Sequence, residues 1–432
     1  SEVEVKGQEY DEIAGSMTIQ WEKKEFTLQQ AAALLESPDR SLRENIWYLV
    51  ADRRMQDAGK IDDLFNRLVN LRTKIARNAG FQSFADYKFK ELGRFDYTKE
   101  DCYAFHDSVE KIVKPIYQNV LAQRKAKLGV TTLKPWDLSV SIEGNILRPF
   151  EKGTELISKT ISAFQKMDPD FAEMLKTMQE MQFLDLDSRV GKAPGAYNYP
   201  LTETGIPFIF MNAAGTQGDL STMFHEAGHA IHSFLVRDIP LTILQHPPME
   251  VAELASMSME LMSMHYWTEF YHDPAFLKQA KREQIHRTLA ILPWVATVDC
   301  FQHWIYDHPE HTTAERREAW ASVYQRFQGD SIDWTGLELY RDHLWHKQGH
   351  IFDVPFYYIE YGLAQLGAYQ IWKHYKEDPV RGLYNYRKGL SLGYTKNIRQ
   401  IYQDAGIQFD FSKNMMESLF AFVLEELESL EE

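Results

Sequence analysis

The chain is poor in cysteine and in long apolar runs, and it carries no excess of positive charge. Its two cysteines, Cys102 and Cys300, stand far apart and in no metal or redox pairing pattern, which favours a reducing, cytoplasmic compartment over a disulfide-stabilised scaffold. No apolar run approaches the roughly 18 residues of a membrane span, and no signal peptide is visible. The net charge of −15 argues against nucleic acid as a partner.

Helical patterns dominate the sequence and predict a mainly α fold. An apolar content of 44% and an aromatic content of 13% indicate a folded chain, long enough for two or three domains. Strand-like residues gather at 139–149 and 195–212, and the stretches 135–149 and 191–195 indicate joints between helical blocks. Apolar periodicity predicts helices over residues 28–36, 42–57, 61–78, 99–127, 155–181, 219–236, 250–270, 274–298, 314–327, 356–375 and 412–427.

The most informative feature is the H-E-x-x-H motif at residues 225–229, which lies in a stretch of helical period. Residues four apart lie on the same helix face, so His225 and His229 can share one Zn²⁺. Glu226 is near enough to act as general base on a metal-activated water. Asp219 is placed to cap the helix. The motif predicts the working end of a zinc peptidase, the alternative being a core helix with two hydrogen-bonded histidines.

A catalytic zinc site needs a third protein ligand and one open position. Glu250, Glu253 and Glu260 are the candidates, on a Met- and Ala-rich helix that Pro247-Pro248 can start. Glu253 lies 24 residues after His229, enough for a loop and an antiparallel helix, and its buried charge needs a cation. We therefore assign Glu253 as the ligand. Glu260 either orients a ligand histidine or lies on the surface, and Glu250 suits the first turn.

At this point the sequence resembles the thimet oligopeptidase and oligoendopeptidase F group of zinc peptidases, most nearly the bacterial oligoendopeptidase F branch. The likeness is strong from about residue 191 to 422 and looser before it. The matching segments are residues 195–197, 207–212, 225–229, 253–257, 350–361, 392–394 and 404–407.

The resemblance implies two mostly helical lobes around a deep channel, with a small β-sheet beside the zinc helix. Residues 1–190 are then the N-terminal lobe, and residues 191–432 are the catalytic lobe with one Zn²⁺. Members of the group carry a longer N-terminal region, so we expect part of one lobe to lie outside this chain. A deep channel admits short unstructured peptides and excludes folded proteins.

The resemblance also assigns oxyanion and substrate contacts to His350, Tyr358 and Tyr361. The two tyrosines are three apart, so we expect them on one helix face, with Tyr361 as the oxyanion donor and the other two positioning substrate. The alternative is an aromatic packing stripe. His232 is expected to pack, because a fourth ligand would close the metal site.

The segment Ile206–Asn212 is typical of a strand. We expect it to be an edge strand that holds an extended peptide by backbone pairing, and a plain core strand is the alternative.

Three functions fit these features. The first is a zinc endopeptidase that hydrolyses internal bonds of short peptides, with Glu226 as general base. The second is a metallocarboxypeptidase of related fold, which would need a cationic pocket for the substrate's terminal carboxylate. The third is a peptide-binding protein without turnover, against which the intact Glu226 argues, because a binder has no need of a base.

Overall fold

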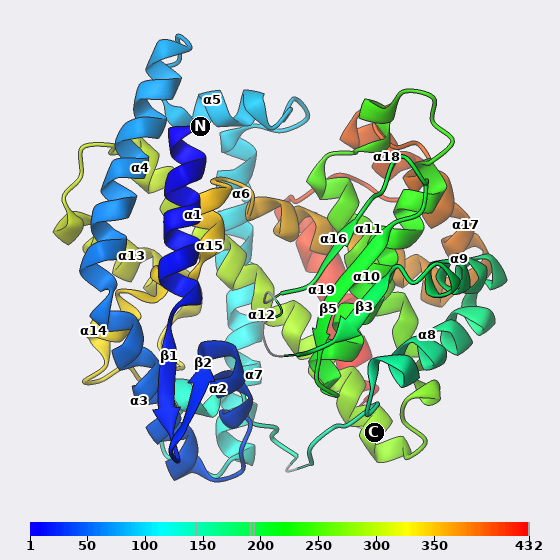
Figure 1. Cartoon of the computed structure of the whole chain (residues 1–432), viewed down its shortest axis with the longest axis horizontal. Helices are drawn as coiled ribbons and strands as arrows, with labels where there is room; N and C mark the ends of the chain where they lie inside the picture. Colours follow the sequence, from blue (N-terminus) through cyan, green and yellow to red (C-terminus); the bar gives the residue numbers. More distant parts are fainter. Residues whose placement is uncertain (144, 190–191, 193–194, 431–432) are drawn as a thin grey trace. The chain divides into compact units, whose positions relative to one another are not determined.

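The computed structural model describes residues 1–143, 145–189, 192 and 195–430 (Figure 1). Helices dominate, and within these ranges the strands form one sheet of two and one sheet of three. The predicted mainly α fold class is confirmed. No helix in the described ranges is both long enough and apolar enough to cross a membrane.

The chain divides into two compact units, each built from two segments. The first contains Ser1–Asn145 and Leu289–Ile359, and the second contains Ile146–Thr288 and Glu360–Glu432. The boundary predicted at residue 190 falls inside the second unit, whereas the division after Asn145 falls inside the predicted joint 135–149. Of the predicted joint 191–195, only residues 192 and 195 are among those described.

The first unit is helical apart from a hairpin of β1 (Thr18–Trp21) and β2 (Lys24–Thr27), whose turn residues Glu22 and Lys23 both have positive φ, as a tight two-residue turn requires. Its helices are α1 (Glu2–Gly15), α2 (Leu28–Leu34), α3 (Arg40–Gln56), α4 (Ala58–Asn78), α5 (Phe84–Glu91), α6 (Lys99–Ser108), the π-turn η1 (Val109–Val113), α7 (Lys114–Lys127), η2 (Pro135–Asp137), α13 (Thr313–Gln328), α14 (Glu338–Arg341), η5 (Leu344–Lys347) and α15 (Gly349–Asp353).

One long helix, α12 (Pro274–Asp307), contributes residues to both units. Its residues up to Thr288 belong to the second unit, and those from Leu289 onward belong to the first.

The helix predicted over 99–127 is interrupted by η1, which separates α6 from α7. The predicted strand-like stretch 139–149 has no strand among its described residues. Its backbone instead follows η2, where the buried carboxylate of Asp137 accepts from both Arg40 and Arg43.

The second unit holds the three-stranded sheet and the H-E-x-x-H helix. Its strands are β3 (Leu184–Asp187), β4 (Tyr197–Tyr199) and β5 (Phe208–Ala213). Its helices are α8 (Gly153–Met167), α9 (Pro169–Glu180), α10 (Gln217–Val236), η3 (Thr242–Gln245), α11 (Met249–Ser263), η4 (Met264–Glu269), the first part of α12, α16 (Ile359–Glu377), α17 (Pro379–Leu390), α18 (Ile398–Asp404) and α19 (Lys413–Glu428).

The predicted strand over Ile206–Asn212 is present as β5, but it is not an edge strand. The sheet order is β3-β5-β4, with β5 parallel to β3 and antiparallel to β4. The expectation was wrong because the short Leu184–Asp187 segment also forms a strand and occupies the second side of β5. The two edge positions belong instead to β3 and β4, and Tyr197 and Tyr199 of β4 are exposed.

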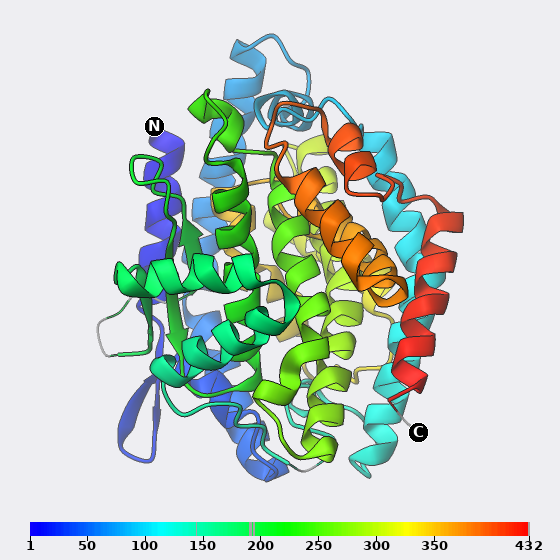
Figure 2. The ribbon, with the colours of Figure 1, turned by 90° about the vertical axis from the view of Figure 1, so that its right-hand side faces the viewer.

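Helices α10 and α11 lie side by side in the second unit, and α8 and α9 pack against α10 (Figure 2). The apolar residues of α10, such as Leu220, Phe224 and Ile231, are fully buried. The predicted helix over 155–181 is divided at Asp168, which caps α9 just before Pro169. Proline at the first helical position has no N–H to satisfy, so it starts α9 and cannot continue α8.

Candidate metal centre

Helix α10 begins at Gln217, two residues before the predicted start. Thr216 is the N-cap: its Oγ1 accepts from the Asp219 N–H, while the Asp219 carboxylate accepts from the Thr216 N–H at 2.9 Å. Asp219 also accepts from the Ala214 N–H at 2.9 Å. The prediction that Asp219 is the cap was therefore wrong by three residues, and the pair forms a reciprocal capping box. It ties the end of β5 to the helix that carries the motif.

His225 and His229 lie one turn apart on α10, as their spacing predicts. Their ring centroids are 4.8 Å apart, and the side chains keep exposed fractions of 21% and 18%. A small molecule can therefore reach both imidazoles from solvent.

Glu253 completes a three-donor group with these histidines. Its Oε2 lies 3.4 Å from His225 Nε2 and 3.7 Å from His229 Nε2, and the three donor atoms all lie within 4.8 Å of one another. Two ligands of a tetrahedral zinc ion stand about 3.3–3.8 Å apart, given bonds of about 2.0–2.3 Å. Glu253 is buried, and Ser256 Oγ donates to the same oxygen at 3.0 Å. The arrangement suits a divalent cation.

Glu253 reaches the histidines because two helix backbones come very close. A Cβ on Gly228 would lie 2.7 Å from both the Ala255 carbonyl oxygen and the Ser256 Cα. Only glycine leaves room for this approach. His225 contacts Glu260, whereas the later His229 contacts the earlier Glu253, so the two helices run antiparallel, as predicted. Pro248 caps α11, and Glu250 lies in its first turn, also as predicted.

Glu260 contacts one of the two histidines, His225, at its Nδ1 atom. Its Oε1 lies 2.7 Å from His225 Nδ1, and its Oε2 accepts from Gln284 Nε2 at 2.8 Å. Gln284 in turn accepts from Ser221 Oγ at 2.7 Å. Two positions were open for Glu260, beside a ligand histidine or on the surface, and the structure places it beside a histidine. Gln284 and Ser221 were missed, because single polar residues on apolar helices give no sequence signal of their own.

Glu226 is 5% exposed, and its Oε2 has no hydrogen-bond partner among the residues that the structure describes. Burial raises the pKa of Glu226 to about 7. Burial also acts to raise the pKa of Glu253, but the neighbouring His229 and His225 lower it to about 2. The two glutamates therefore differ in character, one a poised proton acceptor and the other a permanent anion.

His232 is buried, and burial lowers the pKa of its imidazole to about 3, so the ring is neutral. It is outside the three-donor group, in keeping with the packing role expected of it.

The remaining predicted site residues are divided between the units. His350 and Tyr358 belong to the first unit, where their ring centroids are 5.0 Å apart, and Gln348 Nε2 lies 2.8 Å from His350 Nδ1. Tyr361 belongs to the second unit. Helix α16 begins at Ile359, so Tyr358 lies in the preceding turn and the expectation of one shared helix face was wrong. The approach of these side chains to the His225 group stays a prediction.

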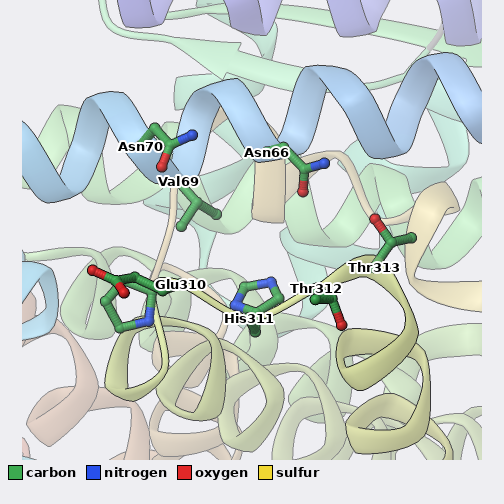
Figure 3. A pocket seen from close by; sticks show the side chains of 8 residues that line it. Asn66, Val69, Asn70, Glu310, His311, Thr312 and Thr313 are labelled. Atoms are coloured by element: carbon green, nitrogen blue, oxygen red, sulfur yellow. The ribbon is translucent and has the colours of Figure 1, made fainter.

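A hollow of about 360 Å³ lies in the first unit between α4 and the loop before α13. Figure 3 shows Asn66, Val69 and Asn70 on one side and Glu310 to Thr313 on the other. Two of its polar side chains are already engaged, because Arg316 Nη1 contacts both Asn66 Oδ1 at 2.8 Å and His311 Nε2 at 3.2 Å. The residues that line this hollow are separate from the His225, His229 and Glu253 group.

Part of the sequence is similar to curated relatives. An oligoendopeptidase F homologue from Lactococcus lactis subsp. lactis is 28% identical over 147 residues, which are 34% of this chain and 24% of the relative. One from Borreliella burgdorferi is 25% identical over 294 residues, 65% of this chain and 48% of the relative. The matches thus span from a quarter to a half of the length of these two relatives.

Solved structures share the fold. A structure of PZ peptidase A with an inhibitor aligns with a TM-score of 0.93 and 30% identity over 98% of this chain and 75% of its own. The oligoendopeptidase F of Enterococcus faecium, 18% identical, aligns with a TM-score of 0.67 over 99% of this chain and 72% of its own.

Fold and site together define a mainly helical protein with a two-histidine, one-glutamate donor group on an H-E-x-x-H helix. The profile of Peptidase family M3 matches residues 33–420, nearly the whole chain. The chain belongs to Peptidase family M3, and its resemblance to the oligoendopeptidase F branch is confirmed.

Proposed function

We propose that this chain carries the active site of a zinc-dependent endopeptidase that hydrolyses internal bonds of short, unstructured peptides. The observation that supports this most directly is the convergence of His225, His229 and Glu253 beside Glu226, whose buried Oε2 has no hydrogen-bond partner in the described part of the chain. Two imidazole donors and one carboxylate are a donor set typical of catalytic zinc, and they leave one position open.

Zinc fits this donor set on grounds of charge as well as distance. A buried carboxylate such as Glu253 is costly unless a cation pairs with it, and two histidines and one glutamate leave a net positive centre when a divalent ion binds. When bound, the ion would polarise the scissile carbonyl and lower the pKa of an attacking water. His225 and His229 would be oriented for this by their helix, and His225 additionally by Glu260.

Glu226 would move the proton. Its carboxylate would take a proton from the attacking water and then give it to the amine that leaves when the peptide bond breaks. A pKa near 7 in the buried state suits a group that must both accept and release a proton at neutral pH, and a nearby cation would lower it further toward the base form.

Substrate would be held along β4 instead of β5. The free side of β4 lies at the edge of the sheet, where an extended peptide can add as a further strand through backbone hydrogen bonds. Such pairing is indifferent to side chains and suits an enzyme that accepts varied short peptides. We propose Tyr361 as the donor to the oxyanion, with His350 and Tyr358 positioning substrate.

An internally quenched peptide of about ten residues tests this proposal, since that length spans the several residues a strand-like site pairs with. Wild type and Glu226→Gln are compared at matched zinc content, with product masses read by mass spectrometry. We expect internal cleavage by wild type and none by the variant. Cleavage only of the last residue, lost when the peptide is amidated, would indicate a carboxypeptidase. Binding without cleavage by either protein would indicate a peptide-binding protein.

A further inference from the structure

Four chemistry-bearing side chains meet in the interior of the first unit, apart from the site described above. Cys102 and His106 lie four residues apart on α6, and Asp299 and His303 lie four residues apart on α12. Each pair therefore shares one helix face. All four side chains are at most 2% exposed. Polar groups so deeply buried in a mainly apolar core need partners.

The distances are those of a compact donor cluster. The donor atoms of Cys102, Asp299 and His303 all lie within 4.8 Å of one another. Asp299 Oδ2 is 3.4 Å from His303 Nε2 and 2.9 Å from His106 Nε2. His106 thus holds the Asp299 carboxylate by a hydrogen bond, as Glu260 holds His225 in the other cluster.

Hydrogen bonds within the protein do not satisfy this cluster. Among the described residues, Asp299 Oδ1 and both ring nitrogens of His303 have no hydrogen-bond partner. The rings of Tyr103 and Phe356, each with its centroid 5.0 Å from that of His303, flank the imidazole without offering it an acceptor. Leaving a buried polar atom unpaired costs about 1–3 kcal/mol, so several together call for an explanation.

We propose that Cys102, Asp299 and His303 bind a second divalent ion of the zinc class, with His106 positioning Asp299. Thiolate and imidazole are the donors that borderline-soft ions such as Zn²⁺ and Co²⁺ prefer, and a carboxylate completes the set. The ion would neutralise two buried negative charges. Because its ligands come from α6 and α12, it would join two helices that are far apart in the sequence. This inference is independent of the peptidase proposal.

The sequence contains one local signal for this site. Cys102 and His106 form C-x-x-x-H, and Asp299 and His303 form D-x-x-x-H, each at the helical spacing also found in H-E-x-x-H. Nothing in the sequence shows that the two pairs face each other, because that depends on packing between helices separated by about two hundred residues.

The chain supplies its own matched control in the second cysteine. Cys300 is the neighbour of Asp299 in sequence, but its Sγ lies 3.9 Å from Arg326 Nη1 and outside the donor cluster. Burial raises the pKa of the Cys300 thiol to about 11, so it stays protonated at neutral pH. A Cys300→Ser variant therefore removes a thiol close by without removing a proposed ligand.

Cobalt titration of the metal-free chain tests the proposal. Co²⁺ bound to a thiolate gives a near-ultraviolet charge-transfer band, which the His225–His229–Glu253 group lacks the sulfur to produce. We expect this band and about two Co²⁺ per chain in wild type and in Cys300→Ser, with metal content measured by mass spectrometry. Cys102→Ser should lose the band and bind about one ion, whereas His225→Ala should keep the band.

His303→Gln is a second ligand variant, needed in case Cys102→Ser does not fold, and circular dichroism checks the folding of both variants. The glutamine keeps a polar side chain of similar size. We expect the His303→Gln variant to lose the charge-transfer band or shift it while the peptide cleavage activity persists. A wild type with no thiolate band at saturating Co²⁺, or a band that survives Cys102→Ser, would overturn the proposal. In that case the cluster is a buried His–Asp–His network and holds no ion.

Discussion

The His225 cluster (His225, His229 and Glu253) and the Cys102 cluster (Cys102, Asp299 and His303) share the same spacing of residues along a helix. They differ in how far solvent can reach them. Each combines residues four apart on one helix with a partner from a neighbouring helix, and each has a further residue that holds one member in place. The side chains of His225 and His229 are about one-fifth exposed, whereas Cys102, Asp299 and His303 are fully buried. Access therefore separates a site suited to turnover from one suited to joining helices.

The difference also lies in what stands beside each cluster. Glu226, next to His225 in sequence, presents a buried carboxylate oxygen that has no partner among the residues described, which suits the proton transfer proposed for it. The corresponding neighbour in the first unit is Cys300, which stays a thiol beside Arg326. Four experiments can test this difference between the two clusters.

Glu226→Gln should have the largest effect. The amide keeps the size of the side chain but cannot accept a proton, so we expect kcat/KM for peptide cleavage to fall about 10³- to 10⁴-fold. Metal content and the unfolding midpoint should stay within error, because Glu226 is outside the donor group. A loss of metal along with activity would instead make Glu226 a structural support of the cluster.

Gly228→Ala should come next, because it forces α10 and α11 apart. The added Cβ would meet the Ala255 carbonyl oxygen and the Ser256 Cα at 2.7 Å, so the backbone must shift and carry Glu253 away from the histidines. We expect a loss of about 1–3 kcal/mol in the free energy of unfolding, from overpacking, and roughly a 10²-fold loss of activity. Denaturant titration and peptide cleavage measure the two effects.

Gly218→Ala on the same helix is the matched control. Its added Cβ would lie 3.4 Å from Thr216 Oγ1, an ordinary contact, so stability should be unchanged or slightly higher. Equal losses in both variants would mean that glycine matters for the flexibility of α10, not for the approach of α11.

Much of the His225 cluster could be predicted from sequence because its signals are local. His225 and His229 are fixed by one helical turn, and Glu253 by a short loop and the antiparallel return of α11. The place of β5 in the sheet was not predictable in this way, because it depends on pairing with β3, a short segment about twenty residues earlier. Cap assignment failed at Asp219 because Thr and Asp three residues apart both qualify, and only the backbone decides between them.

The Cys102 cluster shows the limit of local signals. Helix α6 and the part of α12 that carries Asp299 and His303 are widely separated in sequence. The chain returns to the first unit at Leu289, and no change in amino-acid composition indicates this return. Tertiary packing alone brings Cys102 to Asp299 and His303, so only the structure could show their meeting.

Glu260→Gln should weaken metal binding at the His225 cluster without abolishing it. The variant keeps a group near His225 Nδ1 but loses the negative charge that raises the basicity of the ring. We expect zinc affinity to fall about 10- to 100-fold, measured by competition with a coloured chelator. Ser221→Ala, which removes a more distant member of the same hydrogen-bonded chain, should have a smaller effect. Equal effects would show that packing, not charge, supports His225.

The rates of zinc removal should separate the two clusters even where affinities are similar. A chelator can reach the partly exposed His225 cluster directly, but the Cys102 cluster must wait for the first unit to open locally. An opening free energy of only about 1.4 kcal/mol makes removal roughly tenfold slower, so we expect two phases in stopped-flow absorbance with excess chelator. His229→Ala should remove the fast phase and Cys102→Ser the slow one. A single phase that responds to both variants would mean that solvent exposure does not distinguish the two clusters. It would contradict the assignment of one cluster to turnover and of the other to joining helices.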